Sequence, residues 1–240
     1  RRILAMLLLS LVGEQPIPIL LVARALQPQR HILLHTATTQ RVAKNLAGLL
    51  PNVQLERMAD YNLPAAIERL RRLLTETDNV ILNLTGGTKP MALAMYEVAR
   101  SHSVPFFYLQ SQGKQSILYS YTFAPDKSIS QQSHQLPPLL TIDDYLIAHG
   151  LSIGHPQRKF ANPQEIAIGR WFKKLVSEKK LDEYRANLIF AAFEIDFLLR
   201  RGNQVAVVEA KSGKNSRQGI DQLNTIAGRE YLGTYTAKIH

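Results

Sequence analysis

The chain has 240 residues, 45% of them hydrophobic, enough for one large core or for an ordinary core with a smaller second domain. It carries 29 Lys and Arg against 19 Asp and Glu, and the basic excess is larger in residues 151–240 (15 against 9) than in residues 1–150 (14 against 10). This balance favours a polyanionic partner. The absence of cysteine excludes disulfides, thiol catalysis and cysteine-ligated zinc.

The first element in the chain is an apolar run, residues 3–12, which follows Arg1 and Arg2 and superficially resembles a signal peptide. No small-residue cleavage site follows it, and the run is too short to cross a bilayer. We therefore expect a first buried strand, no membrane partner and a cytoplasmic location, which the lack of cysteine also fits.

The first half of the chain alternates between short apolar runs and segments with helical spacing. We expect strands at residues 3–12, 30–35, 53–57, 80–84 and 105–110, and helices at residues 18–26, 40–50, 64–75 and 91–100. Such alternation predicts an α/β fold with a Rossmann-like parallel sheet. Ligands of these folds bind beyond the carboxyl ends of the strands.

The stretch "NLTGGTKPMALA" (residues 83–94) lies at one such strand end. Gly86 and Gly87 allow close approach of a ligand to the backbone, Thr88 can cap the following helix, and Pro90 suits its first turn. Amide N–H groups beside the Lys89 ammonium favour an anion, most often phosphate. The alternative is an ordinary capped turn whose glycines serve packing alone.

The middle of the chain is more polar. Residues 117–123 alternate as a further strand, and we expect residues 124–138, rich in Ser, Gln and Pro, to be a linker or surface loop. Thr141 and Asp144 have the spacing of a capping box and predict a short helix that Gly150 ends. A longer helix follows from Pro163, and we expect its Trp171, Phe172 and Leu175 to be packing residues. The predicted organisation is a domain at 1–125, a linker with the short helix at 126–161, and a second domain at 162–240.

The C-terminal part contains the pattern Asp-x12-Glu-x-Lys. We expect residues 188–199 and 204–210 to form a hairpin that places Asp196 and Glu209 on adjacent strands, with Lys211 on the same face as Glu209. Two carboxylates suit Mg²⁺ or Mn²⁺, which would acidify a water for phosphodiester hydrolysis while Lys211 orients it or offsets negative charge. The alternative is that these acidic side chains are only solvated.

With these residues identified, the chain resembles a CRISPR-associated Rossmann fold (CARF) sensor joined to a restriction-endonuclease-like, PD-(D/E)xK nuclease. More narrowly, it is similar to CRISPR ancillary nucleases activated by cyclic oligoadenylate. The resemblance is carried by "SLVGEQPIP" (residues 10–18) and "NLTGGTKPMALA", and by "GRWFKKL" from Gly169, "FEIDFLL" from Phe193 and "VVEAKSG" from Val207.

The resemblance implies both a sensor site and a nuclease site. Asp196, Glu209 and Lys211 match the nuclease motif, whose substrate is DNA, RNA or both, with Asp196 and Glu209 as metal ligands. The resemblance also implies a homodimer that binds cyclic tetra-adenylate, the ring made by type III CRISPR complexes in antiviral defence, across its two-fold axis. The residues implied to bind the ring are Gly13, Gln15, Thr85, Gly86, Gly87, Thr88 and Lys89.

One departure from the family pattern affects the nuclease. A glutamate usually follows the helix tryptophan in a Gly-x-Trp-Leu-Glu pattern, whereas this chain has Lys173 there, and Glu165 is a poor substitute because a capping role explains it. The alternative function is therefore a ring-sensing, nucleic-acid-binding protein with an inactive nuclease domain. A dinucleotide-dependent oxidoreductase is disfavoured, because Gly-x-Gly-x-x-Gly is absent. A P-loop nucleotide-binding protein is also disfavoured, because Gly-x4-Gly-Lys-Ser/Thr is absent.

Overall fold

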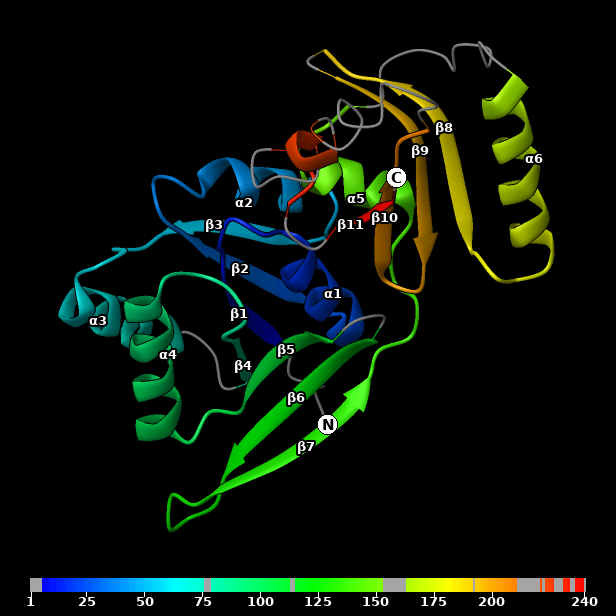
Figure 1. The fold of residues 1–240 in the computed structure, drawn as a ribbon. Helices are drawn as coiled ribbons and strands as arrows, with labels where there is room; N and C mark the ends of the chain where they lie inside the picture. Colours follow the sequence, from blue (N-terminus) through cyan, green and yellow to red (C-terminus); the bar gives the residue numbers. More distant parts are fainter. Residues whose placement is uncertain are drawn as a thin grey trace. The chain divides into compact units, whose positions relative to one another are not determined.

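The computed structural model describes residues 6–75, 79–112, 115–152, 163–191, 193–210, 221, 223–226, 231–233 and 236–239. It divides into two compact units, Arg1–Leu136 and Pro137–His240. None of the helices in these ranges is both long and apolar enough to cross a bilayer. The elements, labelled in Figure 1, are β1 (Leu7–Leu11), α1 (Ile17–Leu26), β2 (Arg30–His35), α2 (Gln40–Ala47), β3 (Val53–Arg57), α3 (Leu63–Leu74), β4 (Val80–Asn83), α4 (Lys89–His102), β5 (Phe106–Gln112), β6 (Gln115–Phe123), β7 (Ile129–Gln135), α5 (Ile142–Ala148), α6 (Pro163–Ser177), β8 (Glu183–Ile189), β9 (Glu194–Arg201), β10 (Gln204–Val208) and β11 (Ala237–Ile239).

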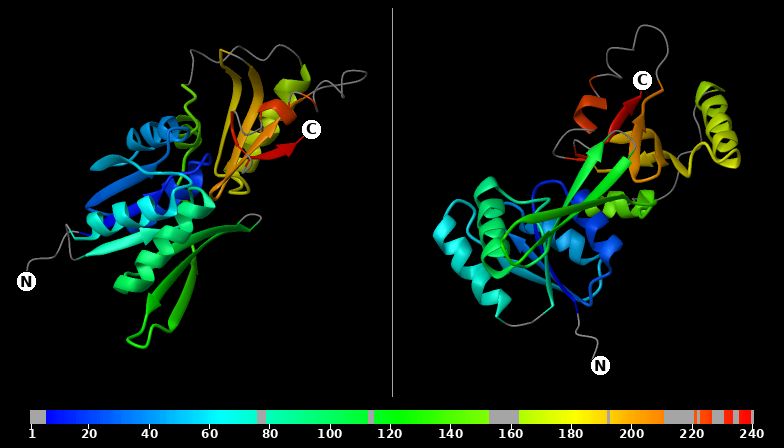
Figure 2. Two further views of the ribbon diagram at one scale, coloured as in Figure 1. Left: turned by 90° about the vertical axis from the view of Figure 1, so that its left-hand side faces the viewer. Right: turned by 90° about the horizontal axis from the view of Figure 1, so that it is seen from below.

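The first unit is built on a seven-stranded sheet in the order β3-β2-β1-β4-β5-β6-β7. Strands β1 to β5 are parallel, which confirms the predicted Rossmann-like sheet, and β6 and β7 extend it antiparallel. The alternate residues Leu7, Leu9 and Leu11 join the core formed with α3 and α4, which lie side by side in Figures 1 and 2. The intervening residues of β1, among them Ser10, therefore point to the other face of the sheet, where α1 packs.

The interpretation of residues 124–138 as a linker or loop is wrong for their central part. Ile129–Gln135 forms the edge strand β7, paired with β6 over its whole length after a turn in which Ala124 N–H donates to Ser128 O at 2.9 Å. All seven residues of β7 are exposed. A strand with solvent on both faces has no apolar alternation, so its pairing left no pattern in the side chains.

The second unit has a four-stranded sheet in the order β11-β10-β9-β8, with β11 parallel to β10 and the other pairs antiparallel. Helix α6 buries Phe172 against Phe197, Leu199 and Val208 on one face of this sheet. The prediction of a single strand over residues 188–199 is wrong. The chain turns between β8 and β9, where Phe190 N–H donates to Phe193 O at 2.9 Å. No glycine, proline or asparagine marks that turn in the sequence.

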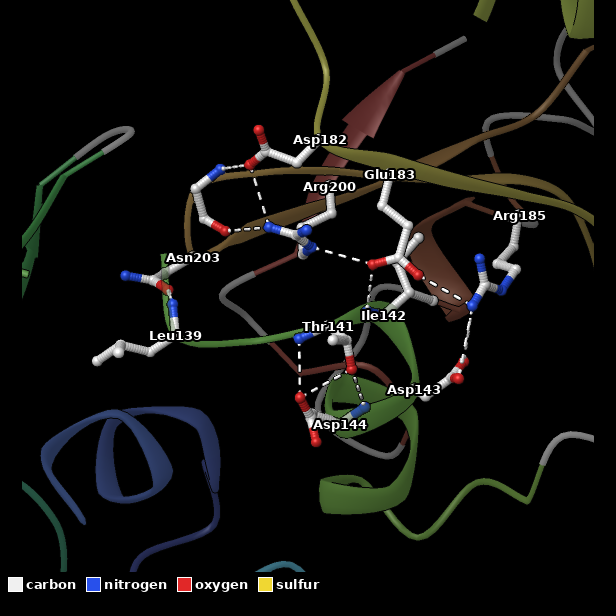
Figure 3. Close-up of polar contacts among 11 residues, drawn as sticks. Leu139, Thr141, Ile142, Asp143, Asp144, Asp182, Glu183, Arg185, Arg200 and Asn203 are labelled. Carbon is white, nitrogen blue, oxygen red and sulfur yellow. Dashed lines mark hydrogen bonds and ion pairs between the residues drawn. The ribbon is translucent and has the colours of Figure 1, made fainter. Parts of the chain in front are cut away.

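Helix α5 begins with the predicted capping box, in which Thr141 and Asp144 exchange hydrogen bonds between side chain and backbone. A polar network around Arg200 attaches it to the small sheet (Figure 3). The Arg200 guanidinium contacts Glu183 and Asp182, each at 3.1 Å, and Glu183 accepts the Ile142 N–H at 3.0 Å. The Arg200 and Glu183 side chains are only 12% and 16% exposed, so this network is a largely buried brace between β8, β9 and α5.

The segment before α5 is attached to the same sheet by the turn between β9 and β10. The Asn203 side chain accepts the Leu139 N–H at 2.7 Å and donates to Pro137 O at 2.9 Å. Gly202, beside Asn203 in the turn, donates its N–H to Asp182 at 2.6 Å. In Figure 3, Asp182 also contacts Arg200, so the Arg200 network holds this turn as well.

Candidate functional sites

The two central strands of the large sheet, β1 and β4, mark the place where the strand order reverses. Ligands of open α/β sheets bind at the carboxyl ends of strands at such a switch point. The turn after β1 contains Gly13 and Gln15, and the turn after β4 contains residues 85–88. The residues implied to bind a ring therefore lie together at the carboxyl ends of β1 and β4: Gly13, Gln15, Thr85, Gly86, Gly87 and Thr88 on the two neighbouring turns, and Lys89 as the first residue of α4.

The glycines of these turns touch backbone to backbone. A Cβ on Gly13 would lie 3.1 Å from Gly87 N, and a Cβ on Gly86 would collide with the carbonyl oxygen of Leu11. Gly87 has a φ of +77°, and its Cβ would lie 2.9 Å from Leu11 Cβ. Turn-to-turn packing thus requires glycine at Gly86 and Gly87 whether or not a ligand binds, as the packing alternative anticipated.

Both threonines of the turn use their hydroxyl protons within the protein. Thr85 donates to Asn83 Oδ1 at 2.6 Å and accepts the Leu109 N–H at 2.9 Å. Thr88 donates to Asp60 O at 2.7 Å, and it caps α4 as predicted by accepting from Met91 N–H. In this arrangement neither hydroxyl has a proton for an anion. In the first turn of α4, Pro90 has no N–H and the Met91 N–H is taken by Thr88, so the groups suited to a phosphate are the backbone amides of the glycine turn before the helix and the exposed Lys89 ammonium.

A buried polar row supports Thr85 from beneath. Asn83 Nδ2 donates to Ser10 Oγ at 3.2 Å, and Ser10 Oγ lies 2.8 Å from His31 Nε2. The row crosses β2, β1 and β4 and reaches β5 through Thr85. Burial lowers the pKa of His31 to about 4, so the imidazole is neutral near pH 7. His31 is thus a core residue, and the sequence did not link it with Ser10 and Asn83, since only the strand order brings the three together.

The two predicted metal ligands of the second unit occupy facing positions. Val208 of β10 pairs with Phe197 of β9, and the next step of this register places Glu209 opposite Asp196. The Asp196 carboxylate accepts the Ala210 N–H at 2.8 Å, and Glu209 is only 4% exposed. Phe197 and Val208 face α6, so Asp196 and Glu209 point to the opposite face of the sheet. The third member of the motif, Lys211, lies outside the described residues.

Asn187 of β8 lies in line with Asp196 and Glu209 across the small sheet, which the sequence did not suggest. The register of β8 with β9 places it opposite Asp196, but the regular pairing is interrupted there. Asn187 has a φ of 50°, a left-handed conformation that asparagine tolerates better than most residues. Such backbone strain is found preferentially at functional sites. Asn187, Asp196 and Glu209 therefore occupy one row across three adjacent strands.

The donor chemistry of this row suits a hard divalent cation, because carboxylate oxygens are the ligands that Mg²⁺ and Mn²⁺ prefer. Facing residues of an antiparallel pair have Cα atoms about 5 Å apart, near enough to share one ion. Within the described ranges, however, no three His, Asp or Glu side chains gather as a ligand cluster. The sheet thus contributes two facing acidic side chains, Asp196 and Glu209, to this row.

Helix α6 differs from expectation in one aromatic residue. Phe172 is buried and Leu175 packs beside it as predicted, but Trp171 is 56% exposed, so its interpretation as a packing residue is wrong. Helical periodicity places Trp171 one step around from the buried stripe. Lys173 is also exposed, and α6 covers the face of the sheet opposite Asp196 and Glu209.

Comparisons with known proteins place this fold. The Card1 CARF domain family matches residues 7–145. Can2 from Sulfobacillus thermosulfidooxidans, solved in complex with cyclic tetra-adenylate, is similar in structure with a TM-score of 0.76 and 16% identity, over 94% of this chain and 86% of that one. Protein VC1899 from Vibrio cholerae has a TM-score of 0.69 and 13% identity, over 93% and 86%.

A type III CRISPR defence DNA nuclease activated by cyclic oligoadenylate has a TM-score of 0.58 and 17% identity, over 93% of this chain and 44% of that one. Comparison of the sequence with curated proteins gave no match. The family match covers more than half of the chain, including β1, β4 and both glycine turns. The chain therefore belongs to the Card1 CARF domain family.

Proposed function

We propose that this protein is a metal-dependent nuclease of type III CRISPR antiviral defence that is activated by cyclic tetra-adenylate. The observation that carries the proposal is the pairing of two sites in one chain. A CARF unit has its glycine turns at the sheet's switch point, and a second unit has two carboxylates in facing register. The fold similarity to Can2, which was solved with that ring, extends over both units and supports the same pairing.

The sensor site is proposed to hold the ring through Gly13, Gln15 and the turn from Thr85 to Lys89. Backbone amides of the glycine turn before α4 and the Lys89 ammonium would bind its phosphates. The hydroxyl bonds of Thr85 and Thr88 indicate a positioning role, in which they fix the turn that presents these amides. A ring with two-fold symmetry suits an isologous interface, so we propose a homodimer.

The nuclease site is proposed to comprise Asp196, Glu209 and Lys211. When bound, a divalent ion would supply Lewis acidity and an activated water. Asp196 is held toward the ion site by the Ala210 amide, and Glu209 is fixed through its backbone, whose N–H donates to Ile239 O at 3.1 Å. Lys211 would offset the negative charge that develops on the phosphodiester. The substrate is DNA, RNA or both.

The position of Lys173 favours a second candidate function. It replaces the usual glutamate, and α6 covers the sheet face opposite the two carboxylates. A metal site short of one carboxylate would bind its ion weakly. In this alternative, the ring controls nucleic-acid binding by a catalytically inactive second unit.

The decisive experiment is a cleavage assay on labelled single- and double-stranded DNA and RNA, with Mn²⁺ or Mg²⁺, with and without cyclic tetra-adenylate. We expect ring-dependent cleavage that Asp196→Asn and Glu209→Gln abolish, while Glu178→Gln, an exposed acidic residue of the same unit, leaves it unchanged. Cleavage that persists in Glu209→Gln would refute the proposed active site. Ring-dependent binding without cleavage would support the alternative.

A further inference from the structure

The exposed face of α6 combines an aromatic ring with cations. Trp171 is 56% and Ile166 37% exposed, and Arg170, Lys173 and Lys174 are exposed beside them. The only acidic residue between Pro163 and Ser177 is the half-buried Glu165 in the first turn. This half of the helix surface is therefore both positively charged and partly apolar.

Helical geometry gathers these side chains. Arg170 and Lys174 are four residues apart, and Trp171 and Lys174 are three apart, so they are neighbours along the helix. The Trp171 ring lies 5.2 Å from the Phe172 ring at a tilt of 37°, and Phe172 is fixed in the core. The indole is thus held by a buried neighbour while more than half of its surface stays in solvent. A rigid aromatic ring loses little conformational entropy on binding.

Within the part of the chain that the structure describes, the cations of α6 have few acidic partners. Lys174 contacts Glu178 only at 3.8 Å and is 70% exposed, while Glu178 makes its closer contact, 2.7 Å, with Lys180. Burial of Gly169 and Phe172 already accounts for the packing of the helix, which does not require a tryptophan at its exposed edge. Solvated cations beside an exposed ring match a partner with both phosphates and unpaired bases.

We propose that this face of α6, formed by Ile166, Arg170, Trp171, Lys173 and Lys174, binds single-stranded nucleic acid, with one base stacked on Trp171 and the flanking phosphates on Arg170 and Lys174. The inference rests on the proposed function, because it names a second surface that binds the nucleic-acid substrate, outside the active site, on the sheet face opposite Asp196 and Glu209. A single strand is favoured over a duplex because stacking on an indole requires an unpaired base.

The test is fluorescence anisotropy with labelled oligo-dT and oligo-U of about 20 nucleotides, in EDTA so that no cleavage occurs, with and without cyclic tetra-adenylate. We expect Trp171→Ala to weaken binding by about 5-fold or more, and Trp171→Phe to retain most of it. Arg170→Ala/Lys174→Ala should lower the slope of log affinity against log salt by about 1.4. The matched control Arg71→Ala/Arg72→Ala, which removes two exposed cations from α3, should change neither affinity nor slope.

The outcomes separate the two proposals. If the wild-type protein binds neither oligonucleotide with or without the ring but cleaves a substrate in the assay above, the α6 inference fails and the proposed function stands; if it cleaves no substrate either, the proposed function fails as well. If the wild-type protein binds but the α6 variants bind equally well with the same salt slope, only the α6 inference fails. A change of oligomeric state in Trp171→Ala, measured by light scattering without loss of oligonucleotide binding, would show that the face joins copies of the chain and overturn the inference.

Discussion

The two candidate sites depend on different kinds of interaction. The sensor turns depend on backbone contact between glycines and on a buried neutral row from His31 to Thr85. The second unit depends on charged side chains, with Arg200 and Glu183 as its brace and Asp196 and Glu209 as its site. Close backbone contact leaves no room for an added atom, so even one methyl group causes a clash. Contacts between charged side chains respond instead to pH, to salt and to the identity of the partner. Substitutions should therefore affect the two units in distinguishable ways.

The largest expected effect comes from adding one methyl group to the sensor turns. In Gly86→Ala the new Cβ collides with the Leu11 carbonyl oxygen, which is backbone and cannot move aside. We expect the first unit to lose about 4 kcal/mol of stability, with loss of ring binding. Hydrogen exchange of β1 and β4 peptides and ring-binding titration measure both. Gly48→Ala is the matched control, since its Cβ would make only ordinary van der Waals contacts, with Asn45 O at 3.4 Å and Lys44 O at 3.9 Å; an equal loss there would contradict the steric argument.

The next effect tests the charged brace of the second unit. Arg200→Ala removes the guanidinium that contacts the largely buried Glu183 and the exposed Asp182, while Arg185 still contacts Glu183 at 3.0 Å. Removing one partner of a buried pair costs about 3 kcal/mol, and because Arg185 remains we expect a loss of about 2 kcal/mol. Urea unfolding followed by fluorescence of the only tryptophan, Trp171, reports on this unit. Arg72→Ala, which removes an exposed ion pair with Glu68, should cost less than about 0.5 kcal/mol. Similar values for the two variants would show that the network is not a brace.

The pH dependence of stability probes the neutral row. Burial lowers the pKa of His31 to about 4 from an ordinary 6.5, so between these values the unfolded chain binds more protons than the folded one. Stability contributed by neutral His31 is complete above pH 6.5 and is lost as the pH falls toward 4. At pH 5 the first unit should have lost about 2 kcal/mol.

Hydrogen exchange of β2 peptides at pH 7.5 and 5.0, corrected for intrinsic rates, measures this loss. His31→Gln should flatten the difference. The pKa of His149 in the second unit is lowered to about 4 by burial as well, and it provides the internal comparison because His31→Gln should leave its contribution intact. A first unit equally stable at both pH values would contradict the neutral buried state of His31.

The smallest effect concerns Thr85. Thr85→Val keeps the side-chain shape but removes the donor to Asn83 and the acceptor of the Leu109 N–H, so we expect a loss of about 1–2 kcal/mol. Thermal unfolding measures the change. Thr85→Ser should retain both bonds, and Thr122→Val at an exposed position of β6 should be neutral. Weaker ring binding in Thr85→Val but not in Thr85→Ser would support the positioning role.

The sequence was informative where a residue's neighbours are local. Buried parallel strands are mostly apolar on both faces, so β1, β2 and β4 were predictable, as were the caps at Thr88 and Thr141, which involve residues three apart. Strand β7 was missed because a doubly solvated edge has no apolar pattern. The turn between β8 and β9 was missed because aromatic residues occupy it.

The residues of the candidate sites were likewise predictable where a local motif marks them and not where distant strands bring them together. The glycine turn and the pair Asp196 and Glu209 have recognisable motifs, and a correct hairpin register was enough to place the two carboxylates together. The bond between Asn83 and Ser10 joins residues 73 positions apart and depends on strand order. Asn187 was not predictable, since its φ of 50° arises within a strand and not at a turn. The exposure of Trp171 depended on a single step around α6.

The two hydrogen bonds of the Asn203 side chain restrict which residue can occupy the turn between β9 and β10. Its amide substitutes for a peptide group, because one end accepts from Leu139 and the other donates to Pro137 O. Aspartate has the same shape, but its ionised carboxylate has no proton to donate and would place a negative charge against a carbonyl oxygen. The segment that enters the second unit is therefore fastened by a group whose two ends have opposite hydrogen-bonding character, and deamidation of this one residue would release half of the fastening without altering its size.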